Sequence, residues 1–123
     1  MSFVKLYNKS GDPKAVQIQS ALEKKFGALP ETFQAMGRNG DFLEAMLKLH
    51  EASGKGLDVK TKELIAIAVS AANGCDYCVS AHIKFAKDAG VTDEEITAAL
   101  EVVAQMSAFN NFNKSLGLNI DIK

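Results

Sequence analysis

The sequence predicts an all-α fold, a compact helical domain of about six helices. Apolar residues recur at helical spacing, capping residues and glycines bracket the segments, and no clear strand, internal repeat or low-complexity segment is present. With 123 residues and 47% hydrophobic content, the chain is long enough for one domain with its own core and too short for two ordinary ones. We therefore expect a single domain over residues 1–123, with an N-terminal arm at 1–11.

The first predicted helix follows that arm. Residues 1–11 contain polar residues with little periodicity, which is typical of an extended or loosely ordered segment. Asp12-Pro13 reads as an N-cap followed by proline at the first helical position, and an apolar stripe then runs from Val16 to Phe26. A helix should therefore end near Gly27.

Two further helical segments precede residue 58. Pro30 begins a short one that is closed by Gly37 and Gly40. Asp41 is a candidate cap for the next, whose apolar residues share one face up to the glycine at position 54.

The segment from Asp58 to Gly74 differs from the others because residues 64–72 are apolar on every side. The alanine content, the length of about fifteen residues and the Asp58 cap favour a helix over a central strand. A helix that is apolar all round is expected to be buried. Asn73-Gly74 should end it, since glycine readily adopts the left-handed conformation.

The last two predicted helices follow this break. One carries the cysteine motif from Cys75 to about Gly90. Thr92 and Glu95 then form a capping box, and Val91 can pack on Ile96 as a hydrophobic staple, so a long amphipathic helix should start here.

The motif Cys75-Asp76-Tyr77-Cys78-Val79-Ser80-Ala81-His82 contains both cysteines and one of the two histidines. At about 100° per residue, Cys75, Cys78 and His82 fall within one narrow arc of a helix, and Cys78 and His82 are neighbours four residues apart. The positive end of the helix dipole and a basic imidazole both favour a thiolate. A second cysteine at this spacing can capture an oxidised first one as a disulfide.

Glu63 is the candidate for orienting the imidazole of His82 and handling its proton. It lies in the first turn of the apolar helix, about 18 Å along the axis from the break at Gly74. Contact with His82 therefore requires the following helix to double back along the first.

Metal binding is the alternative use of these residues. Cys75, Cys78, His82 and Glu63 could supply four ligands, but structural zinc usually draws on two separated pairs, and no second Cys or His pair exists. Redox chemistry is therefore the preferred interpretation, with no metal and no bound cofactor required.

Charge and hydropathy exclude several other classes. A net charge of −1 with interspersed signs leaves no basic face for nucleic acid or anionic lipid. The N-terminus lacks the pattern of a signal peptide, and no apolar segment approaches the roughly 18 residues of a membrane span. We expect a cytoplasmic protein, where a two-cysteine chain is not a disulfide scaffold.

These residues carry a resemblance to a known family. Glu63, eleven intervening residues, Cys75-x-x-Cys78, three more and then His82, in a small helical chain, resemble the AhpD-like alkylhydroperoxidases of the carboxymuconolactone decarboxylase superfamily. The resemblance covers roughly residues 58–109.

The resemblance implies an all-α fold, a homo-oligomer such as a trimer or hexamer, and thiol-dependent peroxidase or disulfide reductase activity. It implies that Cys78 is the peroxide-attacking thiolate, Cys75 the resolving partner, His82 the adjacent base and Glu63 the end of the relay. Some peroxidases of the family have a histidine where this chain has Tyr77. The superfamily's decarboxylases typically lack the cysteine pair, which argues against lactone decarboxylation.

The leading hypothesis is an oxidoreductase that reduces a small hydroperoxide and is itself reduced by an external dithiol or protein reductant. One alternative is a thiol-disulfide oxidoreductase acting on a protein or lipoyl disulfide. The other is a non-enzymatic module that binds metal or senses oxidation.

Overall fold

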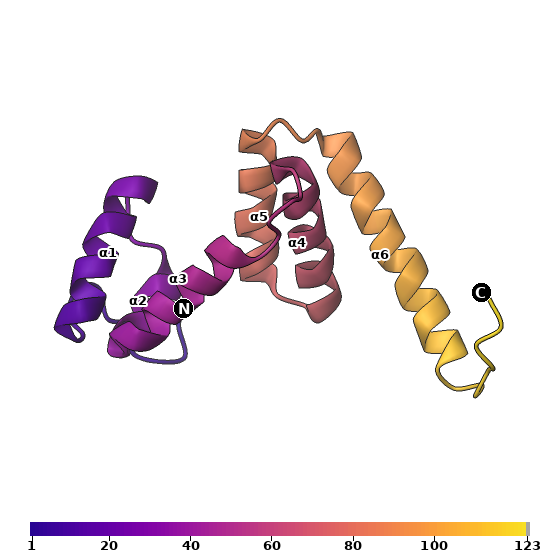
Figure 1. Ribbon diagram of the computed structural model, residues 1–123, viewed down its shortest axis with the longest axis horizontal. Helices are drawn as coiled ribbons and strands as arrows, with labels where there is room; N and C mark the ends of the chain where they lie inside the picture. The colour runs from indigo at the N-terminus through magenta and orange to yellow at the C-terminus, as the bar shows by residue number, and fades with distance from the viewer. Residues whose placement is uncertain (123) are drawn as a thin grey trace. The chain divides into compact units, whose positions relative to one another are not determined.

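Six α-helices and one short 3₁₀ turn account for most of the chain. The computed structural model describes residues 1–122, within which no strand occurs, and the all-α prediction is confirmed. In chain order the elements are α1 (Pro13–Phe26), α2 (Glu31–Ala35), η1 (Met36–Arg38), α3 (Gly40–Ala52), α4 (Val59–Asn73), α5 (Asp76–Asp88) and α6 (Asp93–Asn113) (Figure 1).

The chain divides into two compact units. Residues 1–55 hold α1, α2, η1 and α3, and residues from 56 onward hold α4, α5 and α6. That the whole chain acts as one domain stays a prediction.

In the first unit, Asp12 holds the start of two helices. Its carboxylate accepts a hydrogen bond from the backbone N–H of Ala15 at 2.9 Å, which caps α1 as predicted, and another from the N–H of Gly40 at 2.6 Å, at the start of α3. One side chain thereby satisfies backbone donors of two helices that are far apart in sequence.

The predicted cap of α3 was wrong by two residues. Asp41 lies inside the first turn, and the side-chain oxygen of Asn39 accepts from the N–H groups of Asp41 and Phe42 instead. An asparagine satisfies the cap as well as an aspartate does, and the glycine at position 40 does not prevent a helical start.

The N-terminal arm is tied to α1 by a buried glutamine. The Gln19 side chain accepts from the N–H of Lys9 at 3.0 Å and donates to the carbonyls of Tyr7 and Phe33 at 2.9 and 2.7 Å. Gln19 is fully buried, so these bonds satisfy groups that water does not reach. Residues 7–9 are therefore held in place rather than loosely ordered.

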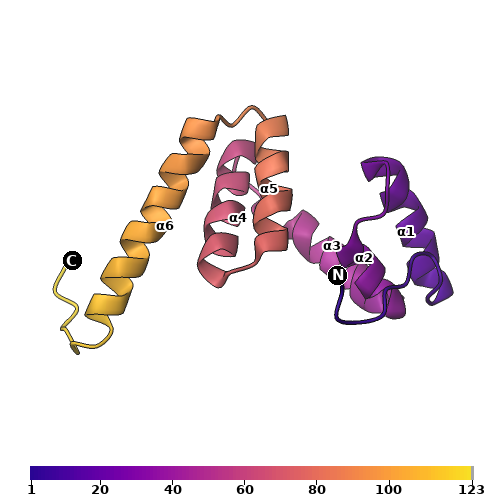
Figure 2. The same ribbon diagram turned by 180° about the vertical axis from the view of Figure 1, so that it is seen from behind.

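In the second unit, α4 and α5 lie side by side and antiparallel, as both views show (Figures 1 and 2). The buried cluster of this unit comes from α4, α5, the loop after α5 and the start of α6, with partly buried residues around it. Its members are Ile67, Ala86, Val91 and Ile96, flanked by Leu64, Ile83 and Leu100.

The start of α6 has the capping box and the hydrophobic staple that the sequence predicts. The Thr92 hydroxyl and the Glu95 carboxylate each accept the other's backbone N–H at 3.1 Å, so the capping box is confirmed. Val91 and Ile96 are both buried, as a hydrophobic staple requires.

The prediction that α4 is buried on every side was wrong for one face. Ile67 is fully buried, whereas Ile65 and Val69 are 48% and 53% exposed. On α6, Val102, Met106 and Phe109 are also exposed. None of the described helices is long and apolar enough to cross a membrane.

We predict that Asp12→Ala lowers the thermal unfolding midpoint, because it removes acceptors from the N–H groups of Gly40 and Ala15. The hydrogen bond from Gly40, followed by that from Ala15, holds the pKa of Asp12 below its usual 3.8. A depressed pKa stabilises the fold above the unfolded-state value and loses that contribution as the pH falls below about 3.8.

The difference between parent and variant should therefore be large at pH 7 and shrink in acid. Thermal unfolding monitored by circular dichroism from pH 7 to pH 3 measures it. Equal midpoints at pH 7 would show that the double cap contributes nothing.

Candidate active site

The two cysteines form a disulfide at the start of α5. Cys75 is the N-cap residue, Cys78 lies in the first turn, and their Cα atoms are 5.3 Å apart. Both residues are half-buried, so solvent reaches this part of the helix. The predicted placement of the motif at a helix start is confirmed.

A tight joint between α4 and α5 positions the disulfide. Gly74, with a φ of 75°, ends α4 in the left-handed conformation, which is strained for residues with a side chain. The N–H of Cys75 then donates to the carbonyl of Ser70 at 2.9 Å, in the last turn of α4. The Cys75 sulfur in turn accepts the N–H of Cys78 at 3.2 Å, so Cys75 ends the joint and caps the next helix.

The same reversal brings Glu63 to His82. The second helix does double back, and the Nδ1 atom of His82 lies 2.6 Å from the Oε2 atom of Glu63. Only 11% of the Glu63 side chain and 24% of the His82 side chain are exposed. A buried polar group without a partner costs free energy, so each of these side chains satisfies the other.

The contact gives the two imidazole nitrogens of His82 different roles. With Glu63 ionised, its carboxylate accepts the N–H of Nδ1, which leaves Nε2 to take up or release a proton. Cys78 precedes His82 by four residues on the same helix, so their side chains lie on adjacent turns of one face. The arrangement is suited to proton transfer at a thiol.

Phe85 is a neighbour of the site that sequence reasoning treated only as an apolar residue. Its ring meets the His82 ring edge to face, with centroids 5.6 Å apart and planes at 88°. This geometry is favourable for aromatic rings and restricts the rotation of the imidazole. The spacing of three residues on a helix was the signal that could have identified it.

Tyr77 lies between the cysteines and is 48% exposed. Its ring therefore borders the solvent side of the first turn of α5. Within residues 1–122, no three His, Cys, Asp or Glu side chains are grouped so that they could hold a metal ion.

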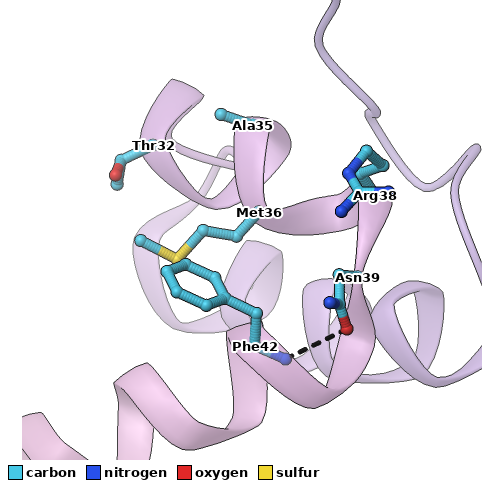
Figure 3. Close-up of a pocket in the computed structure, with 6 residues that line it drawn as sticks. All are labelled: Thr32, Ala35, Met36, Arg38, Asn39 and Phe42. Atoms are coloured by element: carbon cyan, nitrogen blue, oxygen red, sulfur yellow. Dashed lines mark hydrogen bonds between the residues drawn. The ribbon is translucent and has the colours of Figure 1, made fainter.

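A surface pocket occurs in the first unit, among residues 32–42. Figure 3 shows the side chain of Met36 beside the ring of Phe42, and the side-chain oxygen of Asn39 already accepts the N–H of Phe42. None of the four candidate residues lines it. The candidate chemistry therefore rests on the disulfide and the Glu63–His82 contact, without this pocket.

Comparison with known proteins identifies the family of the chain. Residues 40–118 match the model of the carboxymuconolactone decarboxylase family. "Uncharacterized protein 4 in cox locus" of Paracoccus denitrificans is 37% identical over 101 residues, which cover 80% of this chain and 90% of that protein.

A second relative carries a functional name. Alkyl hydroperoxide reductase AhpD of Mycobacteroides abscessus is 39% identical over 64 residues, which cover 52% of this chain. The match spans only 37% of that protein's own length.

The fold has a counterpart among solved structures. The alkylhydroperoxidase AhpD core from Rhodospirillum rubrum superposes with a TM-score of 0.83 over 98% of this chain and 95% of its own, at 22% sequence identity. At that identity the likeness shows the fold alone. Together with the family match and the relatives, it leads to one assignment: the chain is AhpD-like and belongs to the carboxymuconolactone decarboxylase family.

Proposed function

We propose that the protein is a thiol-dependent peroxidase that reduces a small hydroperoxide to an alcohol. The observation that carries the proposal is the 2.6 Å contact between Glu63 and His82, one helical turn beyond a Cys75–Cys78 pair that forms a disulfide. A redox-active pair and an oriented base are the two parts that such a reaction needs.

In the proposed oxidation, His82 takes the proton of Cys78 through Nε2, while Glu63 stabilises the resulting imidazolium. The Cys78 thiolate attacks the terminal oxygen of the hydroperoxide, and the O–O bond breaks. The sulfur becomes a sulfenic acid, and the alkoxide takes a proton from His82 and leaves as an alcohol.

In the proposed resolution, the Cys75 thiolate attacks the sulfur of the Cys78 sulfenic acid. The S–O bond breaks, the hydroxide takes a proton and leaves as water, and the disulfide forms. An external dithiol then supplies two electrons and two protons and returns both cysteines to thiols. No bound cofactor enters the cycle, and a reducing compartment such as the cytoplasm would supply the reductant.

A second candidate is a thiol-disulfide oxidoreductase acting on a protein or lipoyl disulfide. The observation that favours it is the half-exposed start of α5, where a large disulfide partner has access to the cysteines beside Tyr77. Stoichiometric zinc in the purified protein would instead support the non-enzymatic alternative.

We predict that Cys78→Ser abolishes the consumption of an alkyl hydroperoxide in the presence of a dithiol, because serine supplies no thiolate. Cys75→Ser should retain a first turnover but form no internal disulfide, so its steady-state rate should be lower and limited by direct attack of the external dithiol on the Cys78 sulfenic acid. Peroxide loss, measured on a rapid timescale and at steady state, separates the two variants. Turnover by Cys78→Ser at the parental rate would rule out this mechanism.

Glu63→Gln is expected to lower kcat/KM for the hydroperoxide by roughly 10- to 100-fold, as the loss of an orienting partner of a catalytic histidine typically does. The amide preserves the shape of the side chain but does not stabilise the imidazolium. The pH dependence of kcat/KM should shift as well.

The matched control is Glu94→Gln, which changes an exposed carboxylate in the first turn of α6. It should leave kcat/KM and its pH profile unchanged. If Glu63→Gln behaves like this control, the relay has no role in the reaction.

A homo-oligomer is also part of the proposal. Ile65 and Val69 on α4, and Val102, Met106 and Phe109 on α6, leave apolar faces exposed in the isolated chain. A second copy that covers such faces would stabilise both chains by the hydrophobic effect.

Sedimentation should therefore report a species larger than the 13.2 kDa chain. Phe109→Glu should shift the distribution toward the monomer, because a carboxylate resists burial. A parental protein that sediments as a monomer at all concentrations contradicts the oligomer.

A further inference from the structure

The two sulfur atoms of the disulfide have different surroundings. The Sγ atom of Cys75 occupies the N-cap position of α5 and accepts the backbone N–H of Cys78 at 3.2 Å. Cys78 lies three residues further, within the first turn. The difference is built into the backbone, because an N-cap side chain is the one that faces the unpaired N–H groups of a helix.

This asymmetry favours Cys75 as the leaving group in thiol-disulfide exchange. A negative sulfur at the N-cap gains a charge-assisted hydrogen bond and the favourable end of the helix dipole. A thiol of lower pKa leaves faster when the other sulfur of its disulfide is attacked. The N–H contact is already present in the oxidised state, so it supports charge on Cys75 as the bond breaks.

We propose that the external dithiol attacks Cys78, so that Cys75 leaves as the N-cap thiolate. The inference rests on the proposed function only in taking the disulfide as the oxidised intermediate of the cycle. In the first step a partner thiolate bonds to the Cys78 sulfur, the Cys75–Cys78 bond breaks, and its electron pair passes to Cys75.

In the second step the other thiol of the partner, as its thiolate, attacks the partner's own sulfur in the mixed disulfide. The bond to Cys78 breaks, Cys78 takes the electron pair, and the partner leaves as a disulfide. Two electrons have then passed from the dithiol to the protein. His82, four residues beyond Cys78, exchanges the proton as this thiol is released.

In the competing route the external thiol attacks Cys75. The hydrogen bond from the Cys78 N–H to the Cys75 sulfur then stabilises no developing charge. A partner bonded to Cys75 would occupy the N-cap sulfur with a neutral disulfide, and the charge would develop on Cys78 instead. The Cys78 N–H would then face an uncharged sulfur and gain nothing. The reductant therefore bonds to Cys78, and Cys75 bonds only to Cys78.

The negative charge of Asp76 disfavours a thiolate at Cys75. Removing this charge tests whether electrostatics at the N-cap makes Cys75 the leaving group. Its carboxylate lies in the first turn of α5, next to Cys75, and is exposed. A negative charge there is unfavourable for a second negative charge on the Cys75 sulfur. Removing it should speed the reductive cleavage of the disulfide.

The decisive experiment locates the first bond that a thiol makes with the oxidised protein. The oxidised protein is mixed briefly with excess glutathione, quenched in acid, and its free thiols are alkylated. Chymotrypsin cleaves after Tyr77, which lies between the two cysteines, so mass spectrometry assigns the glutathione and the alkyl label to separate peptides.

We expect glutathione on Cys78 and the alkyl label on Cys75, in an excess on the order of tenfold over the reverse labelling. Glutathione found mainly on Cys75, or equally on both, overturns the proposal. The assay contains no peroxide, so its outcome does not depend on whether the protein turns over a hydroperoxide.

The companion variant is Asp76→Asn, with Asp88→Asn at the opposite end of α5 as the matched control. Asp76→Asn should accelerate cleavage by about two- to fivefold and keep the adduct on Cys78, whereas Asp88→Asn should change neither. An unchanged or slower rate for Asp76→Asn contradicts the electrostatic cause.

Discussion

The candidate site depends on one backbone reversal, in which Gly74 adopts a left-handed conformation and ends α4. The reversal has two consequences at once. It turns α5 back along α4, which brings His82 within 2.6 Å of Glu63, and it places Cys75 at the N-cap of α5. A residue with a side chain at position 74 would strain both features together.

The reversal also lets a small buried cluster hold Glu63 and His82 together. The Glu63–His82 contact lies one turn from Ile67, which is fully buried in the cluster that joins α4, α5 and the start of α6. The cluster keeps the helices together, and the helices keep the carboxylate against the imidazole. The cysteines lie at the other end of α5, where both are half-buried and solvent has access.

Much of the fold could be predicted from the sequence because most helix starts are local. The caps at Asp12, Asp58 and Thr92 each satisfy backbone N–H groups within three residues, and such contacts follow from sequence spacing. The second contact of Asp12, with Gly40, joins residues 28 apart and has no local signal. The cap of α3 was misassigned because Asn39 and Asp41 are both good capping residues.

The site was predictable only in part, because some of its contacts are local in sequence and others are not. The adjacent positions of Cys78 and His82 follow from helical periodicity, whereas Cys75 is the extended N-cap residue and the reach from Glu63 to His82 depends on how two helices pack. The apolar pattern of α4 predicts burial on all sides, yet Ile65 and Val69 are exposed in the isolated chain. Sequence records that a face is apolar but does not say whether the same chain covers it.

One measurement tests the central claim most directly, namely that Cys75 and Cys78 are oxidised by a hydroperoxide as one unit. The fully reduced protein, freed of reductant, is mixed with a single equivalent of an alkyl hydroperoxide, and thiols, alcohol and remaining peroxide are counted. We predict the loss of two thiols per chain and the appearance of one alcohol for each peroxide consumed. Intact thiols in the presence of unreacted peroxide would contradict it.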